Sequence, residues 1–161
     1  MVAASLLARA ISGAVLFLAM ASGVLACAVP SGHVGLNGQL AQGINTAREQ
    51  AGLGALPRSA RLDRAARDIA CDNAARGRLS HRSGSGSDLS ARLQKAGYGF
   101  RAAGENLGQG YRSPARAVQG WMNSPGHRQN LLSPQVRELG VAVALGTNGT
   151  RFYAMVAAAP R

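Results

Sequence analysis

Twelve residues, from Trp121 to Leu132, constrain the fold more than any other part of the sequence. They read WMNSPGHRQNLL. Ser124 can cap a new helix and Pro125 suits the first helical position, so one helix ends and another begins here. His127 then lies in the first turn, where the helix dipole disfavours a charged imidazole. We therefore predict that His127 is neutral near pH 7, and a neutral imidazole can accept a hydrogen bond or bind a metal.

The first 26 residues are typical of an export signal. Arg9 is the only charge before residue 48, and an apolar run that ends in small residues follows it at 11–26. This run is shorter than a membrane-spanning helix needs. The sequence VLAC, which ends at Cys27, resembles the bacterial lipobox, whose cysteine is lipidated, so we expect Cys27 to carry a lipid anchor. The alternative is ordinary cleavage after Ala28, and both readings place the folded part outside the cytoplasm, either membrane-anchored or secreted.

The chain is strongly basic. Its formal net charge is +11, and removing residues 1–26, which hold one arginine, lowers it by one, to +10. Such a protein attracts anionic partners such as phospholipid head groups and acidic envelope polymers. Because the arginines are scattered, a solvated surface with no single partner is the alternative, and Arg61, Arg64 and Arg67 come nearest to a stripe. Aromatic residues make up 4% of the chain, which disfavours nucleic acid as a partner.

Cys27 and Cys71 are the only cysteines. If Cys27 carries a lipid, Cys71 has no intramolecular partner, and we expect it to pack within a helix as a small apolar side chain. The domain is then stabilised by packing alone, unlike small disulfide-rich secreted proteins. The C-x-x-C motif of redox and zinc sites is absent.

Hydrophobic periodicity predicts a tether at residues 27–35 followed by one domain at 36–161. Leu36, Leu40 and Ile44 recur at helical spacing and begin the first helix. Further helices are expected over 59–77, 87–97, 113–123 and 126–132, and strands over 98–108 (irregular), 139–145 and 151–157. Asn148-Gly149 is a strong hairpin signal between the last two strands. This order predicts an α+β fold with helices packed on a small, largely antiparallel sheet.

Two histidines and one acid are candidates for a shared site. His81 ends the second predicted helix, Glu105 lies in an uncharged, glycine-rich segment, and His127 begins the short helix. Such a His₂Glu set can bind zinc and leave an open position for water. The alternative needs no metal, because a buried Glu105 must have a partner and either histidine could be that partner. We expect the third histidine, His33, to be solvated in the tether.

Other enzyme signatures are absent. The sequence contains neither Ser-x-x-Lys nor Gly-x-Ser-x-Gly, no cysteine paired with a local histidine and no phosphate-binding loop before a helix. The serine- and glycine-rich run at 83–87 has the composition of a flexible linker. We therefore favour a binding protein over an enzyme.

Taken together, motifs spread over most of residues 38–158 resemble the CAP superfamily of cysteine-rich secretory proteins, venom antigens and plant pathogenesis-related proteins, and above all its bacterial secreted branch. The matching residues are Asn45, Arg48, Gly52-Leu53, Leu56, Leu62, Ala66, Ala70, Ser80-His81, Arg92, Gly97-Tyr98, Gly104-Glu105-Asn106-Leu107, residues 121–132 and Glu138-Leu139-Gly140-Val141. No single piece is specific, but their order and spacing are.

The resemblance implies an α-β-α sandwich whose central cleft is lined, in family members, by two histidines and two acids that bind a divalent metal in some of them. His81, Glu105 and His127 occupy the matching positions. The second acid follows the helix tryptophan by three residues in eukaryotic members and is Ser124 here, and the eukaryotic cysteine framework is absent. The resemblance thus predicts a metal site, with zinc favoured, that lacks one acid.

The leading hypothesis is an exported, lipid-anchored, monomeric CAP-domain protein that binds a lipid or a divalent metal at this cleft, with arginines available for an acidic head group. The rival is a metal-dependent hydrolase in which Glu105 is the general base. A third possibility is an interaction module that uses its basic surface against envelope polymers. CAP-like proteins have been linked to lipid or sterol binding, metal binding, host defence and proteolysis, and the fold alone does not select among these.

Overall fold

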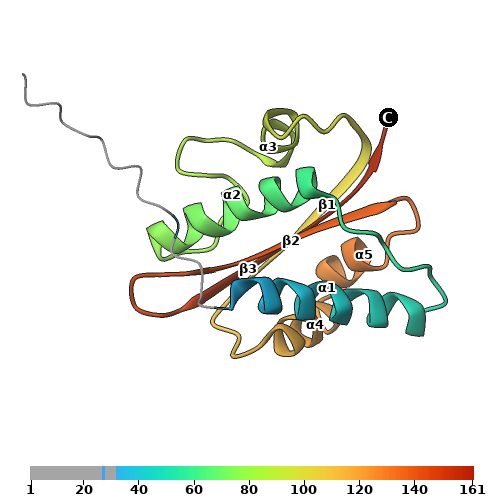
Figure 1. Ribbon diagram of the computed structural model, residues 1–161, viewed down its shortest axis with the longest axis horizontal. Coiled ribbons are helices and arrows are strands. Elements are labelled where there is room, and N and C mark those ends of the chain that lie inside the picture. The colour runs from blue at the N-terminus through green and yellow to red at the C-terminus, as the bar shows by residue number, and fades with distance from the viewer. Residues whose placement is uncertain (1–26, 28–31) are drawn as a thin grey trace, which may run out of the picture.

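The computed structural model describes Cys27 and residues 32–161 (Figure 1). The helices of this part are α1 His33–Gln50, α2 Ala60–Arg76, α3 Leu89–Lys95, α4 Pro114–Met122 and α5 Pro125–Leu131, and the strands are β1 Phe100–Gln109, β2 Glu138–Leu145 and β3 Arg151–Pro160. The predicted export signal at residues 1–26 lies outside the described residues. Within them, no helix combines the length and the apolar character that crossing a bilayer needs.

The three strands form one antiparallel sheet in the order β1-β3-β2. The hairpin predicted at Asn148-Gly149 joins β2 to β3. Its turn needs a positive φ of 78° at Gly149, which glycine adopts without strain, and the Gly149 amide donates to the carbonyl oxygen of Gly146 over 2.9 Å. The last strand in the sequence, β3, is therefore the central strand of the sheet, and β1 and β2 form its two edges.

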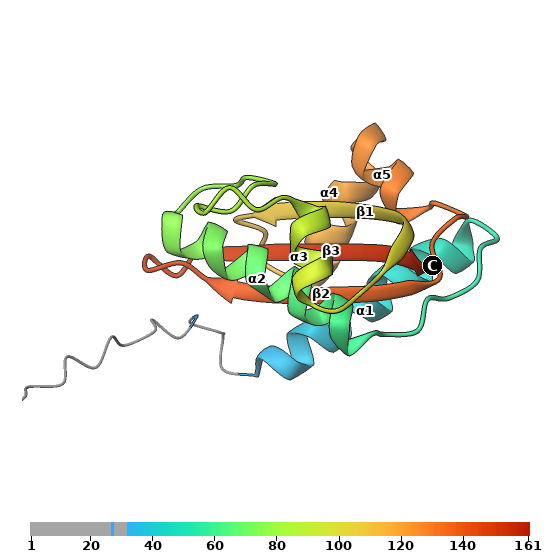
Figure 2. The same ribbon diagram turned by 90° about the horizontal axis from the view of Figure 1, so that it is seen from above.

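Helices cover both faces of this sheet, with α1, α4 and α5 on one face and α2 and α3 on the other (Figures 1 and 2). Successive side chains of β2 and β3 alternate between the two cores. Val141 and Val143 pack with α1 and α4, whereas Ala142 and Ala144 pack with α2. The predicted α+β sandwich is confirmed.

Helix α2 and the sheet approach each other closely at Gly140 on β2. A Cβ atom at this position would lie 2.1 Å from the backbone carbon of Leu62 on α2, so only glycine fits. The next residue of α2, Asp63, accepts a hydrogen bond of 2.9 Å from the amide of Val141 on the edge strand β2. These two contacts fix the first half of α2 against the edge strand.

Two element boundaries differ from the sequence-based expectation. The first helix begins at His33, so it takes up the last three residues of the segment predicted as a tether at 27–35. The strand expected to be irregular over 98–108 is a continuous ten-residue strand, Phe100–Gln109, with one irregularity between Phe100 and Ala102. Pairing with β3 along its length overrides the weak strand propensity of its glycines and alanines.

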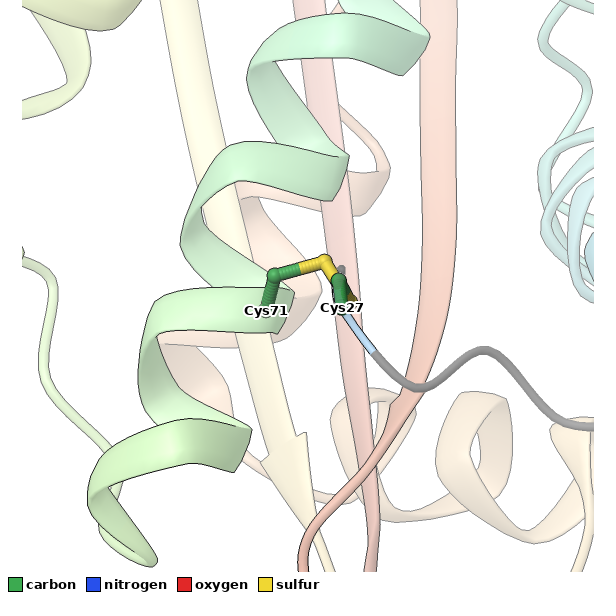
Figure 3. The surroundings of a disulfide bond; sticks show 2 residues. All are labelled: Cys27 and Cys71. Carbon is green, nitrogen blue, oxygen red and sulfur yellow. A yellow bond between two sulfur atoms is a disulfide. The ribbon is translucent and has the colours of Figure 1, made fainter. Parts of the chain in front are cut away.

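A disulfide joins Cys27 to Cys71 on α2, with their Cα atoms 5.3 Å apart (Figure 3). The expectation that Cys71 has no intramolecular partner, and that packing alone stabilises the domain, is therefore wrong. The sulfur that the lipobox reading assigns to a lipid is bonded to Cys71 instead. Because one sulfur atom cannot form both bonds, the lipid anchor and the disulfide exclude each other. Cleavage after Ala28 is equally incompatible with this structure, since it would remove Cys27.

We predict that the folded protein contains no free thiol and that Cys71→Ser lowers the free energy of unfolding by up to about 4 kcal/mol. The bond closes a loop with a sequence separation of 44 residues, which restricts the unfolded chain. Denaturant unfolding measures the loss, and intact mass before and after reduction counts the thiols.

Cys27→Ser is the matched control, since it should destabilise the protein by the same amount, and the double variant by no more than either single one. A lipid adduct on Cys27 together with an unchanged stability of Cys71→Ser would contradict the disulfide and restore the lipid anchor.

Candidate functional site

His81 and Glu105, which are 24 residues apart in the sequence, are in direct contact. Glu105 lies on β1 with 6% of its surface exposed, and its Oε1 accepts a hydrogen bond of 2.8 Å from His81 Nδ1. The His81 side chain is 63% exposed. Asn73 on α2 holds the preceding residue, Ser80, by exchanging two hydrogen bonds of 3.1 Å with its backbone. The end of α2 thus directs an exposed imidazole onto a buried carboxylate.

Arg92 on α3 is the second partner of Glu105. Its Nη2 lies 2.5 Å from Glu105 Oε2, and its Nη1 donates to the carbonyl oxygens of His81 and Ser87 over 3.1 and 2.9 Å. The arginine is 3% exposed, so both charges of this pair are buried. Sequence reasoning required a partner for Glu105 but named only the histidines. The helical spacing could have indicated this contact, since Arg92 lies between Leu89 and Leu93 on the inward face of its helix.

His127 is held near this pair by an asparagine network between α5 and β1. Asn106 donates to the backbone oxygen of His127 over 2.8 Å, and Asn130 donates to Asn106 Oδ1 and to the backbone oxygen of Glu105 over 3.0 and 3.1 Å. A Cβ atom at Gly104 would lie 3.0 Å from Asn130 Oδ1, so the glycine leaves room for this side chain. Sequence reasoning placed both asparagines in family motifs but gave them no role.

The two histidines have pKa values shifted in opposite directions. The hydrogen bond to Glu105 raises the pKa of His81 above its ordinary value, with a further contribution from the charge of Glu105, against the opposing effects of burial and of Arg92. Burial lowers the pKa of His127, and the charge of His81 lowers it further. His127 is therefore neutral near pH 7, as predicted, although burial rather than the helix dipole is the main cause.

These shifts have opposite consequences for stability. A raised pKa means that protonation of His81 stabilises the fold at low pH, and that this contribution is lost as the pH rises through the shifted value. A lowered pKa means that His127 contributes stability above its ordinary pKa, about 6.5, and that this is lost as the pH falls. The fold is therefore stabilised by the protonated form of His81 and by the neutral form of His127.

The structure brings His81 and Glu105 into contact and couples His127 to His81 electrostatically, but it does not form a ready three-ligand site. Among Cys27 and residues 32–161, no group of three His, Cys, Asp or Glu side chains is arranged to hold a metal ion. Both oxygens of Glu105 are already engaged, by His81 and by Arg92. Ser124, at the position of the second family acid, precedes α5 as its N-cap residue and supplies no carboxylate.

We predict that His81 titrates above and His127 below the ordinary histidine pKa, and that His81→Ala raises the pKa of His127 by removing a neighbouring positive charge. NMR of the imidazole C–H resonances across pH 5–9 measures all three histidines. His33→Ala is the control and should leave both values unchanged. Equal titration of His81 and His127 in the unmodified protein would show that the two rings do not experience this environment.

Comparison with known proteins supports the fold. The sequence model described as CAP, the cysteine-rich secretory protein family, matches residues 42–157. The protein YkwD of Bacillus subtilis is 34% identical over 100 residues, which make up 60% of this chain and 38% of YkwD. The matched part thus spans about two fifths of that relative.

Two solved structures share the fold. An extracellular protein of Bacillus anthracis that contains an SCP domain superposes with a TM-score of 0.71 at 31% identity, covering 79% of this chain and 41% of its own. An outer surface protein of Borrelia burgdorferi superposes with a TM-score of 0.70 at 21% identity, covering 76% of this chain and 90% of its own, which is a likeness of fold alone.

Proposed function

This chain belongs to the CAP family, and from that premise we propose that it is an extracytoplasmic binding protein whose ligand contacts His81 and His127. The predicted export signal and the extracellular or surface location of the similar structures support this location. The observation that carries the binding proposal is the contact of an exposed imidazole with a buried carboxylate, His81 with Glu105.

Glu105 supports the ligand site without touching the ligand. Because a carboxylate accepts the hydrogen bond, Nδ1 of His81 carries the proton, and Nε2 is the nitrogen left for an external group. Proteins orient metal-binding imidazoles in this way, with a carboxylate behind the histidine. Arg92 contacts the other oxygen of Glu105 and fixes its side chain in turn.

A divalent metal is the first ligand to test, with His81 and His127 as its protein donors. These residues do not fit a site with three protein ligands, because Glu105 is engaged on both oxygens and Ser124 replaces the second acid. Two imidazoles fit weak, exchangeable binding in which water completes the coordination. When bound, such an ion supplies Lewis acidity at the cleft.

The same geometry disfavours Glu105 as the general base of a hydrolase. A general base must reach the proton that it removes, and both oxygens of this carboxylate face other protein groups. A hydrolytic role for this cleft would have to use one of the histidines as the base.

We predict weak zinc binding near pH 7.5 that is reduced at least tenfold by His81→Ala or His127→Ala and is lost below about pH 6, because protonated imidazole cannot bind a metal. Isothermal titration calorimetry of the oxidised protein measures the affinity. His33→Ala removes the third histidine from the start of α1 and should bind zinc like the unmodified protein. Equal zinc affinity in all four proteins would refute the two-histidine site.

A lipid chain is a second candidate ligand, favoured by a groove of about 700 Å³ between α1 and α4. Gly43, Ala47, Val118 and Met122 supply its apolar wall. The groove is of the size that binds small molecules. An acyl chain would fit between the two helices, with the polar end of the lipid towards Arg116 at the rim.

We predict that native mass spectrometry of protein from a gentle membrane extract shows a co-purifying lipid, and that Thr46→Trp reduces its occupancy by filling the groove. Glu49→Trp places the same bulk on an exposed position of α1 outside the groove and should leave the lipid bound. A bare protein mass under gentle conditions, or equal occupancy in both variants, counts against a lipid in this groove.

A further inference from the structure

A second cavity lies at the edge of the sheet opposite the histidine site. Figure 2 shows β1, which carries Glu105, and β2 at the two edges with β3 between them. A cavity of about 660 Å³ opens beside β2, between the start of α1 and the first half of α2. Residues 141–143 of the edge strand β2 line one side of the cavity, and Arg64 and Arg67 line its α2 side. Nothing in the histidine site accounts for this second cavity.

Positive charge at the cavity is not balanced by the acids of α2, because each of these acids is already paired. Their pairs are Asp63 with Arg58 at 2.6 Å, Asp68 with Lys95 at 2.9 Å, and Asp72 with Arg76. Arg64 makes a single hydrogen bond, to the backbone oxygen of Ala96, and Arg67 makes no ion pair or hydrogen bond with another described residue. Two exposed arginines one helical turn apart thus line the cavity, and neither has an acidic partner among the described residues.

Contacts of Asp63 and of Cys71 hold the α2 wall of the cavity in place. Asp63 is fixed twice, by Arg58 and by the amide of Val141, so the acid within the cavity is not free to bind either arginine. Cys27 also lines the cavity, and its disulfide to Cys71 ties this wall to α2. A preformed cavity of this kind binds a ligand at little cost in ordering.

We propose that this cavity binds a phosphate ester, with the phosphate oxygens at Arg64 and Arg67 and the rest of the ligand beside the edge strand β2, between α1 and α2. Guanidinium groups bind phosphate oxygens through paired, charge-assisted hydrogen bonds. The volume exceeds that of a phosphate ion and suits a ligand of small-molecule size. The same chemistry is present in an anionic phospholipid head group and in a soluble phosphate ester.

The test compares the oxidised, metal-free protein with Arg64→Gln/Arg67→Gln and with a charge-matched control, Arg101→Gln/Arg112→Gln. Both control arginines are exposed and lie outside the cavity. Calorimetry with pyrophosphate probes the soluble source, and co-sedimentation with phosphatidylglycerol vesicles, against phosphatidylcholine vesicles, probes the lipid source. Circular dichroism checks that all three proteins fold.

We expect the unmodified protein and the control to bind, and Arg64→Gln/Arg67→Gln to lose about tenfold or more in affinity. Binding to vesicles alone identifies a lipid head group as the source, and binding to pyrophosphate alone identifies a soluble ester. Equal loss in the control would show that only the overall charge matters and would overturn the proposal. Absence of binding to both probes in the unmodified protein would also overturn it.

Discussion

The buried ion pair between Arg92 and Glu105 is the interaction on which the rest of the site depends. Glu105 lies on the edge strand β1 beneath α3, and a carboxylate in such a place is costly unless a cation neutralises it. Removing one partner of a buried pair costs about 3–5 kcal/mol, because it leaves the other charge uncompensated. The same guanidinium also binds the backbone of His81 and Ser87, so it connects α3, the loop before it and β1.

The ion pair also determines the chemistry of the two histidines. Glu105, fixed by Arg92, selects the tautomer of His81 and raises its pKa, while His127, held through Asn106, has its pKa lowered by burial and by His81. One ring readily accepts a proton and the other resists it. A ligand at this site therefore meets two imidazoles of different basicity, which supports polar recognition even where no metal is bound.

The sequence predicted best the features that depend on neighbouring residues. The hairpin at Asn148-Gly149 and the helices expected to begin near residues 87 and 113 follow from local backbone chemistry, and the structure has all three. The family motifs brought His81 and Glu105 together, and that contact is present. Arg92, Asn106 and Cys27 were assigned no partner or the wrong one, because each is paired with a residue from another element, and periodicity within one segment carries no information about such a pairing.

The disulfide bears on the export, the folding and the location of the protein. Cys27 directly follows the predicted signal segment, so its bond to Cys71 can form only if processing leaves that residue in the chain. Such a bond persists outside the reducing cytoplasm, which agrees with the proposed extracytoplasmic location. It joins the segment before α1 to α2 beside the arginine-lined cavity, whereas the histidine site lies on the far edge of the sheet. Reduction of the disulfide should therefore loosen the wall of the phosphate-ester cavity directly. It should affect His81 only indirectly, through α2.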